Sequence, residues 1–303
     1  MPQLQAPRRA APLLRNCRRE VARAVRVTRG AYARRMGGWE EVARGIHRRR
    51  YDPMDISVVA IDGPDGITVV DSRSTPAEAR EIIADIEREF ARPIAALIVT
   101  HAHFDHTFGN EVFAEAGIPI YGHQLVAAHH AEFESLRAEV ASGDVVLTAP
   151  THPINLRTII APGGRDIELI PLGPGHTDTD VAILVPDTRV WILGDIIEES
   201  GALMYGTGCF PLDWPGVLTN LADEIRPTDR IVPGHGRIVD REFVLAQRDT
   251  LAAVAASVRT GWADGVSASD AVARHPLGDA WPAGMLEPAF IRGYEKLNRE
   301  TAK

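Results

Sequence analysis

Through most of the chain, apolar runs with the spacing of strands alternate with apolar runs with the spacing of helices. Two β-branched runs, residues 56–61 and 67–70, are separated by Asp-Gly-Pro-Asp-Gly, which predicts a β-hairpin. Residues 77–90 place isoleucines and a phenylalanine on one helical face, after a Thr-Pro pair that is typical of a helix start. A short apolar strand, residues 94–100, then runs directly into His101.

The same alternation continues along the chain and predicts a mixed α/β fold. Short connections between strands and helices are typical of layered architectures. After residue 240 only helical patterns remain. The expected helices cover residues 110–116, 124–140, 214–225, 241–260, 269–274 and 288–299, the expected strands cover 119–122, 159–170, 181–193 and 230–232, and residues 143–158 form a loop or extended segment.

The first fifty residues differ in composition from the rest. They contain fourteen arginines and three glutamates, a net charge of +11, so the remaining residues carry −19 of the total of −8. This opening lacks the apolar core of a secretory signal and has no clear strand or helix punctuation. We interpret residues 1–54 as an Arg-rich, poorly ordered extension, with a transit peptide or a basic arm as alternatives.

The remaining composition narrows the class of protein. Hydrophobic residues make up 45% of the 303 residues, enough for a sizeable core. The two cysteines, Cys17 and Cys209, lie far apart, which argues against a Cys-rich zinc site or a disulfide framework. No apolar run approaches the ~20 residues that span a bilayer, and the acidic body would repel nucleic acid. We therefore predict a cytoplasmic protein that acts on a small molecule, without nucleic-acid or membrane partners, and with a homodimer as one option.

The strongest chemical signal is the run His101-Ala-His103-Phe-Asp105-His106, directly after a predicted strand. Imidazole nitrogen and carboxylate oxygen are the ligands that Zn²⁺ and related first-row metals prefer. Burying these groups without a metal would cost on the order of several kcal/mol. His101 and His103 can reach one metal, while Asp105 and His106 reach a second.

Three single polar residues follow at later turns. They are His176 in Gly-Pro-Gly-His-Thr-Asp, Asp195 in Leu-Gly-Asp and His235 in Pro-Gly-His-Gly. Each follows an apolar strand and lies beside glycine, which allows close backbone approach. Any one alone would more often be an ordinary loop residue. Together with the first run they indicate a convergent set of ligands.

This ordered pattern resembles the metallo-β-lactamase superfamily, from about residue 55 to about residue 247. The resemblance implies an αββα sandwich with the site at one edge of its two sheets. It also implies a catalytic domain of residues 55–240, with C-terminal helices of residues 241–303 packed on the same domain. The expected cofactor is two Zn²⁺ per chain, with iron or manganese as alternatives. The implied ligands are His101, His103 and His176 for one metal and Asp105, His106 and His235 for the other, with Asp195 bridging.

The same resemblance implies a metal-dependent hydrolase in which Asp105 orients a hydroxide that attacks a carbonyl carbon. Asp195 stands where the best-known zinc β-lactamases of the family carry Cys. Glu198 stands where those enzymes carry a Lys that holds the drug's carboxylate, and together with Glu199 it would repel an anionic substrate. An apolar segment, residues 203–214, either favours an uncharged acyl group or merely packs its loop.

We therefore expect cleavage of an ester, thioester, lactone or related acyl bond of a small molecule. The alternatives are a mononuclear iron oxidoreductase that resembles persulfide dioxygenases, or β-lactam hydrolysis as a side activity, and a non-catalytic binding role is left open. Metal content separates these classes.

Other polar residues have weaker context. His129 and His130, in the predicted helix 124–140, are expected to face solvent. His152 is a candidate for substrate contact. Asp71, at the end of the first hairpin, could orient a ligating histidine, or it is a plain strand-ending aspartate.

Overall fold

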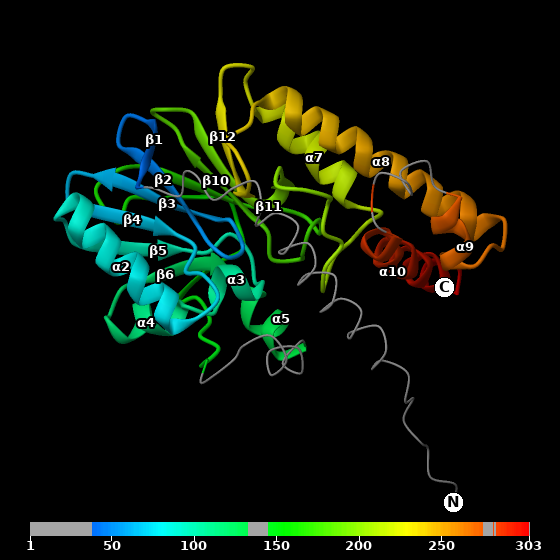
Figure 1. Ribbon diagram of the computed structural model, residues 1–303, viewed down its shortest axis with the longest axis horizontal. Helices are drawn as coiled ribbons and strands as arrows, with labels where there is room; N and C mark the ends of the chain where they lie inside the picture. Colours follow the sequence, from blue (N-terminus) through cyan, green and yellow to red (C-terminus); the bar gives the residue numbers. More distant parts are fainter. Residues whose placement is uncertain (1–37, 133–144, 275–280, 282, 303) are drawn as a thin grey trace, which may run out of the picture.

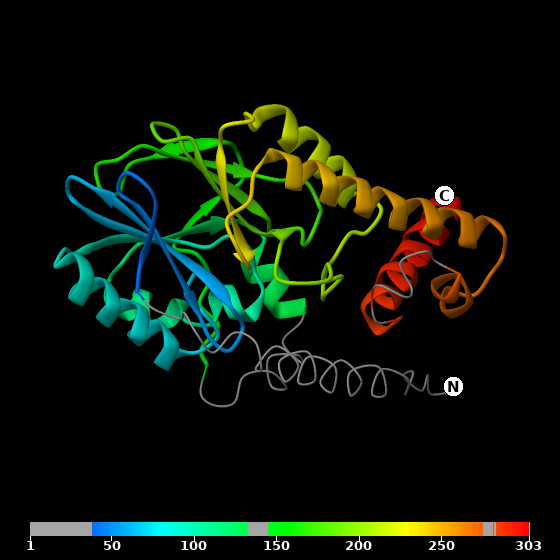
Figure 2. The ribbon, with the colours of Figure 1, turned by 45° about the horizontal axis from the view of Figure 1, so that its top comes forward.

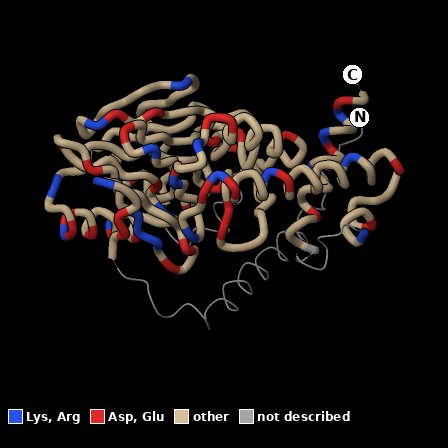
Figure 3. The backbone as a smooth tube through the Cα atoms, turned by 90° about the horizontal axis from the view of Figure 1, so that it is seen from above, with Lys and Arg blue, Asp and Glu red and all other residues tan. Residues whose placement is uncertain are grey.

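The computed structural model describes residues 38–132, 145–274, 281 and 283–302, and the statements below refer to those residues. Figure 1 shows a layered body of strands with helices on its outer sides, and a group of helices at one end. Within these ranges, every helix is too short or too polar to span a bilayer. Figure 3 shows acidic and basic positions interspersed along the chain. Several of these side chains form ion pairs, for example Arg189 with Asp229 at 2.5 Å.

The strands follow one hydrogen-bonded path in the order β7-β6-β5-β4-β3-β12-β11-β10-β9-β8, with β2 on β3 and β1 on β2. The two halves of this path join at a single paired position, His235 with Ile56, so they act as two sheets. The first sheet contains β1 (Glu40–Ala43), β2 (Ile46–Tyr51), β3 (Ile56–Gly63), β4 (Gly66–Val70), β5 (Ile94–Ile98), β6 (Ile120–His123) and β7 (His152–Ile154). The second contains β8 (Thr158–Ile160), β9 (Ile167–Pro171), β10 (Val181–Val185), β11 (Val190–Glu198) and β12 (Arg230–His235).

The two sheets pack face to face through one apolar cluster. Strands of the first sheet contribute Val59, Ile61 and Ile98, and strands of the second contribute Ile183 and Ile192. Each of these side chains is at most 3% exposed. Burial on this face and on the outer face explains why β4 and β10 are apolar at almost every position.

Helices cover both outer faces. The helices α2 (Pro76–Phe90) and α4 (Asn110–Glu115) share an apolar cluster with the first sheet. The helices α7 (Trp214–Glu224) and α8 (Arg241–Ala263) share another with the second sheet. Figures 1 and 2 show the resulting order of helix, sheet, sheet and helix. The predicted αββα sandwich is thus confirmed.

The start of α2 follows the capping pattern expected from its sequence. The Thr75 hydroxyl accepts a hydrogen bond from the backbone N–H of Glu78 at 3.2 Å, and proline occupies the first turn. The helix ends at Ala91, whose φ of 49° turns the chain out of the helix. These local signals fix where α2 lies between β4 and β5.

The sheet begins earlier than the sequence indicated. The interpretation of residues 1–54 as a poorly ordered extension is wrong for its last part, because β2 runs along β3 from Ile46 beside Ile61 to Tyr51 beside Ile56. The sequence pattern did not indicate this strand, because its three consecutive arginines obscure its apolar positions. Arg48 is only 4% exposed, and it donates to the Gly236 carbonyl at 2.9 Å and to Glu40 at 2.8 Å. Residues 1–37 lie outside the described residues.

The C-terminal helices form a small layer of their own at the end of α8. The helices α9 (Ala268–Ala273) and α10 (Ala283–Thr301) pack on α8, and Figure 1 shows them beyond the sheets. Leu286 and Phe290 of α10 belong to the same apolar cluster as Trp214 of α7. The predicted helix over residues 124–140 is described only as α5 (Val126–Glu132), and its remainder lies outside the described residues.

Candidate metal centre

Six of the seven predicted ligands lie at the end of a strand or in the segment that follows a strand, and the seventh lies within a strand. The loop after β5 carries His101 and His103, and the one-turn helix α3 (Phe104–Thr107) carries Asp105 and His106. His176 lies in the loop between β9 and β10. Asp195 lies within β11, and His235 is the last residue of β12. Parallel pairing brings β11 beside β12. The backbone hydrogen bond from the Val181 N–H to the Thr100 carbonyl, at 2.8 Å, joins the segment after β5 to the start of β10.

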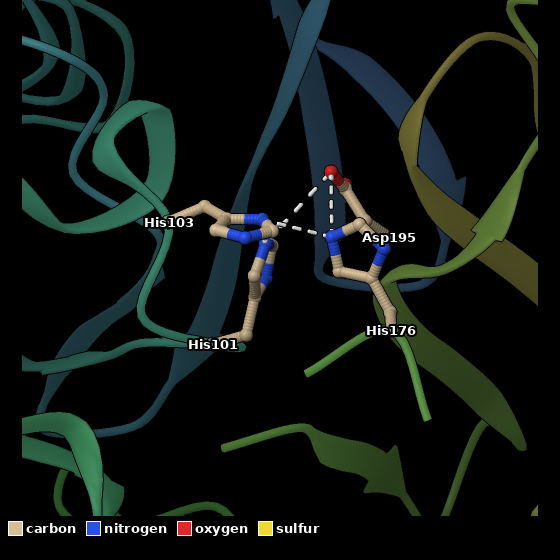
Figure 4. Close-up of side chains that lie close together, drawn as sticks. All are labelled: His101, His103, His176 and Asp195. Atoms are coloured by element: carbon tan, nitrogen blue, oxygen red, sulfur yellow. Dashed lines mark hydrogen bonds and ion pairs between the residues drawn. The ribbon is translucent and has the colours of Figure 1, made fainter. Parts of the chain in front are cut away.

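One group of ligand atoms comes from three histidines. His103 Nδ1 lies 3.1 Å from His101 Nε2 and 2.9 Å from His176 Nε2. Figure 4 shows the three rings pointing toward one another, with Asp195 beside them. Two ligands of one tetrahedral zinc ion, bound at about 2.0–2.1 Å, lie about 3.3 Å apart. The spacing of the three nitrogens therefore suits a single cation.

A second group is formed by one carboxylate and two histidines. Asp105 Oδ2 lies 3.3 Å from His235 Nε2 and 3.8 Å from His106 Nε2. Their ligand atoms all lie within 4.8 Å of one another. These side chains are at most 7% exposed, so the group is screened from bulk water.

Asp195 lies between the two groups. Its Oδ1 lies 3.3 Å from His106 Nε2 and 3.4 Å from His235 Nε2. Its Oδ2 lies 3.6 Å from His176 Nε2 and 3.8 Å from His101 Nε2. Each oxygen thus faces a different group, as a carboxylate that bridges two cations would.

Glycine makes room for this carboxylate. A Cβ on Gly234 would lie 1.9 Å from Asp195 Oδ1, so no side chain fits there without displacing the carboxylate. Gly194, directly before Asp195, has a φ of 52° and lies against Thr100, a position that favours glycine in both respects. The glycines noted beside Asp195 and His235 in the sequence therefore have a steric reason.

Oxygen acceptors hold the outer nitrogens of the histidines. His106 Nδ1 lies 2.8 Å from Asp71 Oδ2, His235 Nδ1 lies 2.8 Å from the Met54 carbonyl, and His103 Nε2 lies 2.8 Å from the Thr207 carbonyl. Such contacts fix the tautomer and leave the other nitrogen free for a metal. Asp71 is therefore a residue that orients His106, which decides between the two interpretations of its position.

We expect Asp71→Asn to weaken metal binding at the second group by about 10–100-fold, because the amide no longer attracts the proton on His106 Nδ1. Competition with a chromogenic chelator measures this affinity. Asp187→Asn, at an exposed turn paired with Arg165, is the control. An unchanged affinity in Asp71→Asn would contradict the orienting role.

Two buried atoms of the centre indicate whether a cation fits between the two groups of ligands. His106 Nε2 and Asp195 Oδ1 are buried and have no hydrogen-bond partner in the described part of the chain. Both point at the shared space between the groups, at 3.3 Å from each other. Buried polar atoms are rarely left unpaired, so this arrangement fits bound metal.

The charges of the two groups differ. Burial lowers the pKa of His176 to about 3, and it also lowers the pKa of His101 and His103, so all three rings are neutral as a metal requires. Burial also disfavours the charged form of His106 and His235, but Asp195 and its neighbouring carboxylates outweigh this and raise both pKa values. The second group therefore attracts positive charge strongly.

Several residues behave differently from the sequence-based expectation. His129 and His130, expected to face solvent, are 5% and 7% exposed. His130 Nε2 lies 2.9 Å from the Ala102 carbonyl, between His101 and His103, so it supports the ligand loop. The helical pattern of α5 gave no sign that these histidines are buried, because the partner of His130 is a backbone carbonyl 28 residues away.

The two acids after Asp195 have different surroundings. Glu198 is only 6% exposed and lies beside Asp195 and His235, and Glu199 pairs with Arg237 at 2.6 Å. That the two acids repel an anionic substrate stays a prediction. Tyr205 and Trp214 are at most 2% exposed and belong to the core, which favours the packing interpretation of residues 203–214.

His152, the candidate for substrate contact, is exposed on β7 at the end of the sheet. It contacts the Thr151 hydroxyl at 3.0 Å and the ring of Tyr121, with ring centroids 4.8 Å apart. The structure therefore places it outside the groups of candidate ligands.

Comparison with known proteins agrees with the layered fold described above. The profile described as "Metallo-beta-lactamase superfamily" matches residues 51–235. A type 2 metallo-β-lactamase from Bacillus sp. (strain 170) is 24% identical over 190 residues, 61% of this chain and 68% of that protein. A hydroxyacylglutathione hydrolase from Nitrobacter winogradskyi is 26% identical over 170 residues, 55% of this chain and 54% of that protein. The sec-alkylsulfatase Pisa1 from Pseudomonas sp. has a TM-score of 0.70 at 17% identity, covering 84% of this chain and 50% of that one, and shares the fold.

Proposed function

This chain belongs to the metallo-β-lactamase superfamily, and we propose that it hydrolyses an ester, thioester or lactone bond of a small molecule at a centre of two divalent cations, with zinc as the expected metal. The observation that carries the proposal is the position of Asp195, whose two oxygens face two separate groups of ligand atoms. A single cation at the first group would use only one of these oxygens, whereas the other oxygen faces the second group.

Two cations held there would act as Lewis acids and lower the pKa of a bound water toward about 7. The residues of the protein would bind the cations and orient the attacking water. Asp105 is an acceptor that can orient an attacking water through its carboxylate, and its pKa stays low because burial is outweighed by His106 and His235. Asp105 is therefore ionised at neutral pH and available for this role.

The type of bond that we propose is inferred from the chemistry of the metal centre and from the names of two related proteins. Metal-activated water suits attack on a polarised carbonyl. Two relatives carry names that denote hydrolysis of acyl compounds, a β-lactam and an acylglutathione.

Metal analysis and an activity screen test the proposal together. We expect two metal ions per chain by mass spectrometry, and turnover of at least one member of a panel of thioesters, lactones, aryl esters and β-lactams. Removal of the metal should abolish that turnover. One iron per chain with oxygen consumption on a persulfide would contradict the hydrolase and support the oxidoreductase alternative.

A further inference from the structure

Glu198 is a buried acid beside the second group of ligands. It is the last residue of β11, and the parallel register with β12 places it opposite His235. Its side chain is 6% exposed. The ligand atoms of Asp195, Glu198 and His235 all lie within 4.8 Å of one another. Glu198 thus lies within reach of the cation that His235 would bind.

The hydrogen bonds of Glu198 involve only one of its oxygens. Oε1 accepts from the Ser200 backbone N–H at 2.8 Å and from the Ser200 hydroxyl at 2.6 Å. Among the described residues, Oε2 has no hydrogen-bond partner, and Glu198 forms no ion pair with Lys or Arg. Ser200 therefore holds the carboxylate in place while one oxygen stays available.

An ionised carboxylate in this position needs a positive partner. Glu198 lies close to Asp195, whose Oδ1 is buried and has no hydrogen bond within the described residues. Two acids this close repel each other unless a cation or a proton lies between them, because the buried surroundings screen their charges poorly. Asp195 and Glu198 together with His235 offer that cation three donors of the usual kinds.

The two groups consequently offer different donors. The first group has three imidazoles and one carboxylate, which suits tetrahedral zinc. Asp105, His106 and His235 offer ligand atoms within 4.8 Å of one another, and so do Asp195, Glu198 and His235. A cation bound by both sets would have five donors, three of them oxygens, which exceeds the four that zinc ordinarily takes and suits a harder, six-coordinate cation.

We propose that Glu198 is an eighth ligand of the centre and that it makes the second position selective for a cation such as Mn²⁺ or Fe²⁺, beside zinc at the first. This inference rests on the two-cation centre of the proposed function. It concerns metal binding alone, so it is tested without a substrate.

Titration of the metal-free protein with Co²⁺ and with Mn²⁺ tests the inference. After one equivalent of Zn²⁺, Co²⁺ at the second position should give the weak d–d absorption of high coordination. In Glu198→Gln this absorption should become more intense, as it does at lower coordination number. We expect the affinity of the same variant for Mn²⁺, measured by electron paramagnetic resonance, to fall at least 10-fold, since even outer-shell changes cost about 10–100-fold.

Two further variants separate ligation from a loss of charge or of folding. Glu199→Gln removes the adjacent acid, which pairs with Arg237, and should leave both readouts as in the unmodified protein. Ser200→Ala keeps the charge but loosens the carboxylate, and should weaken Mn²⁺ binding by a smaller factor. It also keeps the test open if Glu198→Gln does not fold.

An unchanged Co²⁺ spectrum in a folded Glu198→Gln variant would overturn the inference, even if affinity fell, because loss of charge alone does not change the coordination number. Tight tetrahedral binding at both positions of the unmodified protein would also overturn it, and would leave the hydrolase proposal standing. Failure to bind two cations at all would remove both.

Discussion

Asp105→Ala is expected to reduce turnover of the substrate found in the screen by about 10³-fold. Two contributions add up: loss of the group that orients the attacking water, which is worth about 10²–10⁴-fold for general acid–base groups, and loss of a ligand from the second position. Asp105 Oδ2 lies 3.3 Å from His235 Nε2, so its removal opens that group. Steady-state kinetics and the metal content of the same sample measure both effects.

Metal content distinguishes the two contributions. If Asp105 acts chiefly as a ligand, excess metal should restore part of the lost turnover. If it also orients water, turnover should stay low in a sample that again holds two cations. Asp187→Asn, at the surface, is the matched control and should keep full turnover. Full turnover in Asp105→Ala would rule out both roles.

The ligand motif could be predicted from the sequence because most of it is local. His101, His103, Asp105 and His106 follow one strand, and a loop of six residues keeps their side chains together whatever the rest of the fold does. His176, Asp195 and His235 could be added because each follows an apolar strand and lies beside glycine. The structure brings all seven into two adjoining groups, as predicted, and metal binding by them stays a prediction.

Residues whose partners are set by strand register could not be predicted in the same way. Glu198 belongs to the centre only because β11 and β12 pair in parallel, with Glu198 opposite His235. The sequence pointed only to a position that faces the substrate, because Glu198 stands where related β-lactamases carry a substrate-binding Lys. His130 is similar, because its partner is the Ala102 carbonyl, and a backbone atom leaves no mark on the pattern of α5.

The sequence pattern did not predict β2, and the reason is the positive charge of this strand. The β2 segment reads Ile-His-Arg-Arg-Arg-Tyr, and its positive charge hides an alternation of buried and partly exposed positions. Ile46 and Tyr51 are buried, and Arg48 is buried with its guanidinium on Glu40 and the Gly236 carbonyl. An arginine can lie inside a sheet when its charge is paired, which composition alone does not reveal.

Removal of the metals is expected to lower the melting temperature of the protein by roughly 10 °C. A ligand present at 1,000 times its Kd stabilises the folded state by about 4 kcal/mol, and each kcal/mol shifts the melting temperature of a domain of this size by about 2–4 °C. The sign follows from the ligands: a cation that binds only the folded centre stabilises it, and without one the buried acids Asp195 and Glu198 lie within 4.8 Å of each other.

Calorimetry with and without a chelator measures this shift, and added Zn²⁺ should reverse it. Asp195→Ala should melt at a lower temperature with metal present and should respond much less to the chelator, since its centre no longer links the two groups. The Asp187→Asn control should respond as the unmodified protein does. Identical melting curves before and after chelation, in a sample shown to have lost its metal, would mean that the seven ligands are stable without a cation, and the physical argument for the centre would fail.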